Sequence, residues 1–199
     1  QAVVTVNPLP LVNAGPDQTI CIGASVTLSG SGAANYTWNN GVINGVAFAP
    51  TTTATYTVTG TDLKGCINTD QVVVTVNPLP LVNAGPDQAI CIGASATLAG
   101  SGASSYTWTA PVVNNVAFSP TTTNTYTVTG TSAQGCINTD QVVVTVNPLP
   151  TVGAGPDQEV CAGTAVTLSG SGAATYSWSP VITNGVPFTP SVGTVTYTV

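Results

Sequence analysis

Short segments of this chain alternate between apolar and polar residues, and none repeats its apolar residues at the 3.6-residue period of a helix. Val26 and Leu28 alternate with hydroxyl residues, and Tyr56 and Val58 alternate with threonines. A period of two places successive side chains on opposite faces of a strand, so these four residues are predicted to face a core. The pattern therefore predicts an all-β chain.

Turn residues mark the ends of the other predicted strands in this region. A strand at residues 36–38 ends in a tryptophan, and Val46 and Phe48 alternate inward in the next strand. A hairpin turn at residues 63–65 leads into a valine-rich final strand at residues 71–76. Together with an edge strand broken by a turn near the start, these segments make about seven short strands.

The whole pattern recurs every 70 residues. Residues 7–76 and 77–146 differ at 15 of their 70 positions, and residues 147–199 follow the same pattern more loosely. Residues 1–6 match the last strand of a repeat. We therefore expect them to belong to a preceding repeat, and we expect the third repeat, 147–199, to stop before its own last strand.

A proline-rich linker opens each repeat. Pro8 and Pro10 lack a backbone donor and bias the residues before them toward extended conformations. We therefore expect tandem domains joined by short, stiff linkers.

Short strands, a tryptophan on the third strand and a tyrosine opening the penultimate strand together predict a small immunoglobulin-like β-sandwich for each repeat, arranged as beads on a rod. Tyr56 is also predicted to be a tyrosine corner. The expected core aromatic residues, two in each repeat, are Trp38, Tyr56, Trp108, Tyr126, Trp178 and Tyr197.

The cysteines have a regular spacing. Cys21 and Cys66 are 45 positions apart, as are Cys91 and Cys136, and the partner of Cys161 is expected at position 207. We expect one disulfide in each repeat, from the first edge strand to the start of the last strand, in an oxidising compartment. A metal site with two cysteines and no histidine is the less favoured alternative.

Composition excludes several functions. The 199 residues include a single Lys or Arg and no His, and only 4% are charged. Nucleic-acid binding needs cations that neutralise phosphates, and acid–base catalysis would have few groups to use, so we expect no nucleic-acid partner and no enzyme. No apolar run approaches the roughly 20 residues of a membrane span, so we expect no membrane insertion in this segment.

Two groups of residues could bind a ligand. Asp17, Asp62 and Asp70 are candidates for a calcium site, because hard cations prefer oxygen ligands. Ser132 replaces the second of them in the next repeat, so we favour backbone capping and expect no cofactor. The tryptophans could stack on sugars, but their position among alternating strand residues favours the core.

Several motifs resemble a known family. Residues 13–18 (Asn-Ala-Gly-Pro-Asp-Gln), Gly23, 26–32 and 36–38 resemble the PKD-type immunoglobulin-like domain. Residues 55–61, 65–66 and 72–76 look like the cysteine-containing repeats of very large surface proteins in gliding, type IX-secreting bacteria. The resemblance implies a secreted, cell-surface stalk or adhesin without catalytic residues. The acidic run that usually follows the PKD tryptophan is replaced by Asn-Asn-Gly, so no role of those acids is carried over.

The leading hypothesis is a structural stalk or filament that projects other domains, and the alternative is an adhesive module that binds glycan or another surface through the variable loops 39–45 and 109–115. Expected partners are the neighbouring repeats and, in a filament, other copies or surface proteins. We expect the chain to be an excerpt of a longer array. Strand exchange between copies is the less favoured account, because it would leave Cys161 unpaired and would end the chain inside its penultimate strand.

Overall fold

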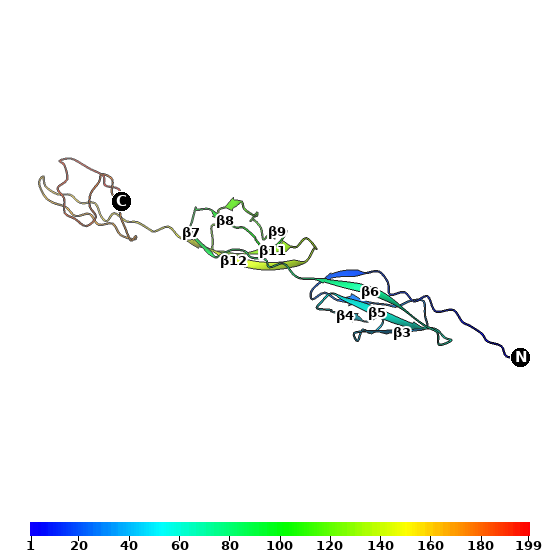
Figure 1. Cartoon of the computed structure of the whole chain (residues 1–199). Coiled ribbons are helices and arrows are strands. Elements are labelled where there is room, and N and C mark those ends of the chain that lie inside the picture. Colours follow the sequence, from blue (N-terminus) through cyan, green and yellow to red (C-terminus); the bar gives the residue numbers. More distant parts are fainter.

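The structure, a computed structural model, describes all 199 residues as three units in a row, with the two termini at opposite ends of an extended molecule (Figure 1). The strands of the first unit are β1 (Gln18–Cys21), β2 (Val26–Thr27), β3 (Asn35–Trp38), β4 (Ala47–Phe48), β5 (Ala54–Thr61) and β6 (Ile67–Asn77). Those of the second are β7 (Gln88–Cys91), β8 (Ala96–Thr97), β9 (Ser105–Trp108), β10 (Ala117–Phe118), β11 (Asn124–Thr131) and β12 (Ile137–Asn147).

Each of these two units contains a four-stranded and a two-stranded sheet. The larger sheet has the order β1-β6-β5-β3 in the first unit, and β2 pairs with β4. The second unit repeats this topology as β7-β12-β11-β9 with β10-β8. The chain is all-β, with tandem immunoglobulin-like sandwiches, as the alternation predicts. No helix in the structure has the length and apolarity needed to cross a membrane.

The first strand of the unit runs parallel to its neighbour, unlike the other strands of the larger sheet. β5 runs antiparallel to both of its neighbours, whereas β1 runs parallel to β6, with Gln18 opposite Val74 and Cys21 opposite Asn77. The end of β1 therefore lies beside the end of β6, at the pole of the unit that faces the second unit.

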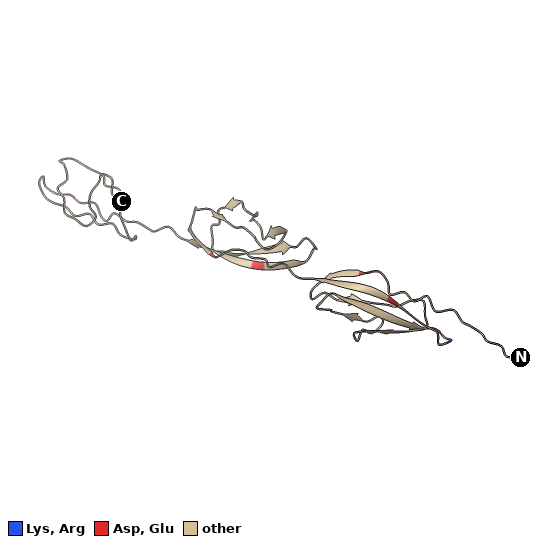
Figure 2. Ribbon diagram, in the orientation of Figure 1, with Lys and Arg blue, Asp and Glu red and all other residues tan.

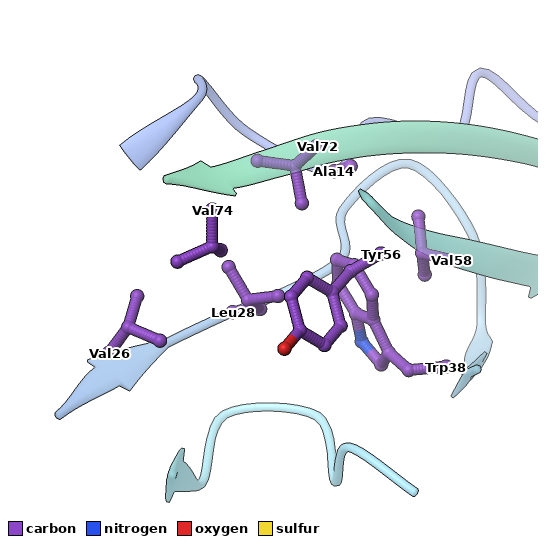
Figure 3. Close-up of a cluster of buried hydrophobic side chains, with 8 residues drawn as sticks. All are labelled: Ala14, Val26, Leu28, Trp38, Tyr56, Val58, Val72 and Val74. Atoms are coloured by element: carbon purple, nitrogen blue, oxygen red, sulfur yellow. The ribbon is translucent and has the colours of Figure 1, made fainter. Parts of the chain in front are cut away.

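The core of the first unit lies between its two sheets (Figure 3). Along β5 every second residue is buried, including Tyr56 and Val58. Phe48 packs edge-on against Tyr56, with ring centroids 5.2 Å apart. The eight buried residues of this cluster are Ala14, Val26, Leu28, Trp38, Tyr56, Val58, Val72 and Val74.

Three details differ from the sequence-based predictions. The unit has six strands, because the segment at Asn13 forms only an isolated bridge to Ser31. Val46 lies outside β4 and is 51% exposed, because it belongs to the turn before that strand. The tyrosine whose hydroxyl bonds the backbone is Tyr36, which accepts from Ala33 N and donates to Ala33 O at 2.7 and 2.6 Å, so the prediction of a tyrosine corner at residue 56 was wrong.

The third unit keeps the loops of the fold but not its regular sheet. Its only ladder contacts are isolated bridges, among them Val166 with Phe188 and Ser179 with Thr198. Trp178 is nevertheless buried and Tyr197 is half-buried. In the first unit β6 is the strand that joins β1 to β5, and no segment of this chain occupies that position in the third unit.

Candidate functional site

Hydrogen bonds attach the linker between the first two units to both of these units. β6 ends at Asn77, whose carbonyl accepts the N–H of Ile22 at 2.9 Å. The linker continues to Pro80, which is buried, and its carbonyl accepts the side-chain amide of Asn138 in the second unit at 3.0 Å. Only two residues separate these anchors, so little of the linker can rotate freely.

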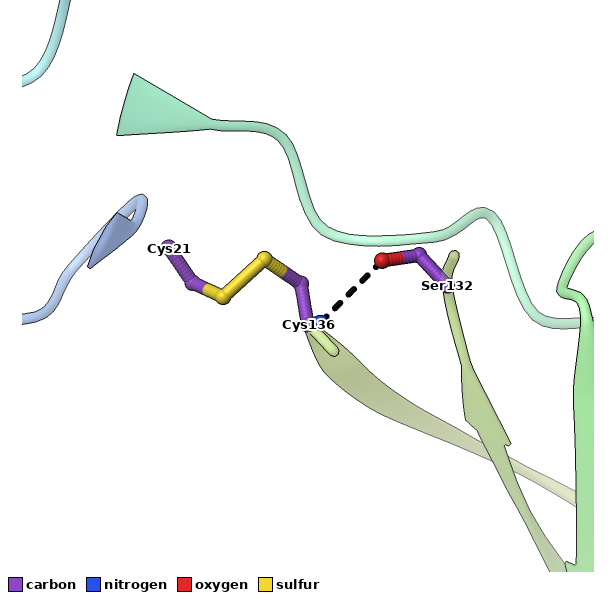
Figure 4. Close-up of a disulfide and its surroundings, with 3 residues drawn as sticks. All are labelled: Cys21, Ser132 and Cys136. Atoms are coloured by element: carbon purple, nitrogen blue, oxygen red, sulfur yellow. Dashed lines mark hydrogen bonds between the residues drawn. A yellow bond between two sulfur atoms is a disulfide. The ribbon is translucent and has the colours of Figure 1, made fainter. Parts of the chain in front are cut away.

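A disulfide forms a second connection across the same junction. Cys21, the last residue of β1, is bonded to Cys136, which lies just before β12 (Figure 4). Their Cα atoms are 5.6 Å apart, within the usual range for a disulfide. Cys136 is fully buried, and its N–H donates to the Ser132 hydroxyl at 3.1 Å.

The prediction of a disulfide within each repeat, Cys21–Cys66 and Cys91–Cys136, was wrong. Cys21 lies opposite Asn77, at the end of β6, whereas Cys66 precedes the first residue of that strand. Ten residues of strand separate those two ends, which is about 33 Å at 3.3 Å per residue. The parallel pairing of β1 and β6 therefore places the two cysteines of one unit at opposite poles.

The other three cysteines are free in this chain. Cys66 lies before β6, in the position that Cys136 holds before β12, and is half-buried. Cys91 and Cys161 hold the position of Cys21 in the second and third units, and both are exposed. The 70-residue repeat makes pairing within repeats and pairing between neighbours equally regular, so spacing alone does not separate the two patterns.

The three calcium candidates each cap a different part of the backbone. Asp70 accepts the N–H of Ala14 at 2.8 Å, and Asp17 accepts the N–H of Val73 at 2.8 Å. Together they tie the segment before β1 to β6. Asp62 accepts two N–H groups of the hairpin turn, from Lys64 and Cys66.

Backbone donors also shift the acidity of one of these groups. The N–H of Ala14, with that of Gln71, lowers the pKa of Asp70 below its ordinary value of 3.8, and Asp140 shows the same shift in the second unit. No group of three or more His, Cys, Asp or Glu side chains lies close enough together to hold a metal ion. Charged residues are sparse along the whole molecule (Figure 2).

The tryptophans lie in the sandwich, with their indole N–H groups bonded. Trp38 donates to the Asn44 side-chain oxygen at 3.0 Å, and the same oxygen accepts the N–H of Gly30 at 2.7 Å. Trp38 is buried and Trp108 is half-buried against the second core. Asn44 was not among the residues that the sequence pattern singled out. The available signal was an asparagine six positions after each tryptophan, at 44, 114 and 184.

No protein-family model and no curated protein matches this chain. Three solved structures with immunoglobulin domains resemble it at low identity. The insect immune protein hemolin is 17% identical, with a TM-score of 0.38 over 73% of this chain and 48% of its own. The N-terminal eight domains of Down syndrome cell adhesion molecule are 19% identical, with a TM-score of 0.35 over 85% and 33%. Domains 1–5 of Sidekick-1 are 14% identical, with a TM-score of 0.37 over 85% and 46%. The chain thus spans less than half of each of these chains.

Proposed function

We propose that this chain is a stiff segment of the stalk or filament of a large extracellular bacterial surface protein of the adhesin type. The observation that carries this proposal is the double connection between the first two units, through the linker at residues 77–80 and through Cys21–Cys136. A single short linker allows two domains to bend about it. A second covalent bond beside the linker removes most of that freedom, which suits a part that sets distance and direction.

Three further features support an extracellular structural role. A structural disulfide persists in oxidising compartments and is rare in the cytosol. A chain with one Lys or Arg offers almost no site to trypsin-like proteases. The resemblance to PKD-type repeats of gliding, type IX-secreting bacteria suggests secretion to the cell surface and a role in adhesion or gliding motility.

The test is the distribution of angles between the first two units. Negative-stain electron microscopy or small-angle X-ray scattering of the oxidised chain should give a narrow distribution. Cys136→Ser should broaden it, because only the linker then remains. Cys91→Ser is the matched control, since it removes a free thiol from the second unit, and should leave the distribution unchanged. A wild-type chain as flexible as Cys136→Ser would refute the stiff rod.

No cofactor is needed in this proposal, so treatment with a chelator should leave the melting temperature unchanged. A rise on addition of calcium would restore the metal-site hypothesis for Asp17, Asp62 and Asp70.

An adhesive role of the variable loops is the second candidate. Ile43 and Val113 occupy the same position of the loops 39–45 and 109–115, and are 66% and 59% exposed. Exposed apolar side chains on loops that differ between repeats suit contact with another surface. A glycan array and a cell-binding assay with Ile43→Ser and Val113→Ser test this role, and unchanged binding by the double variant would exclude it.

A further inference from the structure

The disulfide Cys21–Cys136 changes the covalent route by which a pull along the molecule crosses the first two units (Figure 4). The bond joins residues that are 115 positions apart in the sequence, although their Cα atoms are 5.6 Å apart. A pull therefore passes through residues 10–21, the two sulfur atoms and residues 136–147. Residues 22–135 form a loop beside this route, and they contain most of both cores.

The part of the route that crosses the first unit is almost fully extended in the folded structure. The Asn68 side chain donates to the Pro10 carbonyl at 2.9 Å, and Cys21 lies opposite Asn77 at the other end of β6. Between these two contacts the route advances eleven positions, from 10 to 21, while β6 advances nine, from 68 to 77. The two extra residues correspond to about 7 Å of slack.

The part of the route that crosses the second unit is β12 itself. Cys136 immediately precedes the first residue of this strand and is fully buried. A pull on its sulfur is therefore transmitted along an extended strand to the opposite pole of the unit. Since Cys136 is buried and Cys21 is half-buried, access of thiols that could reduce the bond is also restricted.

Without the disulfide, the same pull would load hydrogen bonds between strands. It would enter the first unit ahead of β1 and leave at the end of β6, so it would slide these two parallel strands past each other. The β1–β6 ladder and the bond from Ala14 N–H to Asp70 would then be under load. In the second unit the bond from Asn138 to Pro80 and the β7–β12 ladder would be loaded in the same way.

We propose that Cys21–Cys136 is a tension-bearing tether, which carries a pull along β1 and β12 and keeps both cores out of the load path. This inference rests on the proposed stalk, because a tether of this kind acts only in a segment that is pulled from both sides. A stalk whose units unfolded under load would lengthen and lose its direction. With the tether, the first two units keep their length until a covalent bond breaks.

Single-molecule force spectroscopy of the 199-residue chain, held by marker domains fused to its two ends, tests the tether. Reduction with dithiothreitol should lengthen the fully stretched chain by about 400 Å, the extended length of the 115 positions that the bond bypasses. The oxidised chain should show no unfolding step from the first two units at forces at which the reduced chain unfolds them. Extension of the third unit occurs in both states and cancels in the comparison.

Four cysteine variants identify the bond that limits the length. Cys21→Ser and Cys136→Ser should each behave like the reduced chain without any reductant. Cys66→Ser and Cys91→Ser remove free thiols and should behave like the oxidised wild type. If either of these two controls lengthens the oxidised chain, the cysteines pair within the repeats and the tether is absent.

A pair of insertions tests which residues carry the pull. Six Gly and Ser residues inserted between Gly15 and Pro16 lie on the proposed route, and the same six inserted between Asn40 and Gly41 lie on the loop beside it. Both sites are exposed and lie between strands. The first insertion should lengthen the stretched, oxidised chain by about 20 Å, and the second should leave its length unchanged. In the reduced chain both should add the same length. Equal lengthening of the oxidised chain by both insertions would overturn the tether.

These outcomes are separate from the test of the stiff rod, which measures angles without load. If the oxidised chain bends freely but lengthens only after reduction, the stiff rod fails and the tether is supported. If its angles are narrowly distributed but the first two units unfold under load without reduction, the tether is overturned and the stiff rod remains.

Discussion

At the scale of single residues, the core depends on a bond between a tryptophan and an asparagine. Asn44 accepts from both Trp38 and the Gly30 backbone, so its side chain holds the loop after β3 against the ring. The same pair of bonds recurs in the second and third units. A buried indole N–H without such a partner would be costly.

Removing the tryptophan and removing the asparagine should lower the free energy of unfolding by different amounts. Trp38→Ala should lower the free energy of unfolding of the first unit by about 3 to 5 kcal/mol, because it empties the largest core volume. Asn44→Ala should cost about 1 to 3 kcal/mol, because it leaves two donors without a partner. Calorimetry of both variants beside Ile43→Ala, an exposed control, measures the difference. A near-native melting temperature of Trp38→Ala would show that the ring contributes little to the core.

The Asp70 carboxylate predicts a pH dependence. Hydrogen bonds from the Ala14 and Gln71 N–H groups hold its pKa in the folded chain below the ordinary 3.8. A lowered folded pKa adds stability that is complete above the unfolded pKa and is lost as the pH falls through the folded pKa. Asp70→Asn should therefore lower the melting temperature at pH 7, and its difference from the wild type should vanish well below pH 3.8. Glu159→Gln is an exposed control. A difference that persists in acid would exclude a role for the charge.

At the scale of secondary-structure elements, a close backbone contact fixes the segment before β1. Gly32 has a φ of +85°, and a Cβ there would lie 1.8 Å from the carbonyl oxygen of Leu11. This contact is next to the Asn13–Ser31 bridge, where both backbone hydrogen bonds are 2.9 Å long. Only glycine allows the chain to turn there and the two segments to approach so closely.

A matched pair of glycine variants separates the energetic effect of the close contact from that of the left-handed backbone conformation. Gly23 has a similar φ of +88°, but a Cβ there would meet nothing within 4 Å. Gly23→Ala should cost about 1 kcal/mol, from the left-handed conformation alone. Gly32→Ala should cost at least about 3 kcal/mol, because it also displaces the Leu11 backbone. Thermal unfolding of the two variants measures the gap, and equal costs would mean that the segment moves aside freely.

At the scale of the whole molecule, the disulfide makes neighbouring units depend on one another. Cys21 and Cys136 are 115 positions apart, so their bond closes a loop that contains the rest of the first unit, the linker and most of the second. A loop of this length is worth about 5 kcal/mol in the chain-entropy model. That stabilisation belongs to the pair of units, not to either one.

Loss of this bond should therefore uncouple the units. Cys136→Ser should lower the main calorimetric transition and broaden it, as the two units begin to unfold separately. Cys91→Ser, which removes a free thiol, should leave the transition in place. A thiol assay on the native wild-type chain should find three free cysteines. If it finds one, the cysteines pair within the repeats and the connection between units is absent.

The sequence by itself determined the all-β class, the 70-residue repeat, the proline linkers and the inward residues of the long strands. These features are local: alternation with a period of two turns alternate side chains inward, and proline restricts its own backbone wherever it occurs. Val46 was predicted to face the core, and this was wrong. It lies in the turn before the short strand β4, where it continues the alternating sequence pattern of that strand but is not buried.

Only the tertiary structure decided which cysteines pair. A strand has the same alternation whether it runs parallel or antiparallel to its neighbour, so the sequence pattern does not give the direction of β1 relative to β6. That direction places Cys21 beside the next unit and Cys66 at the opposite pole. The regular cysteine spacing suggested a bond within each domain. Because of the strand direction, the bond forms between neighbouring domains instead.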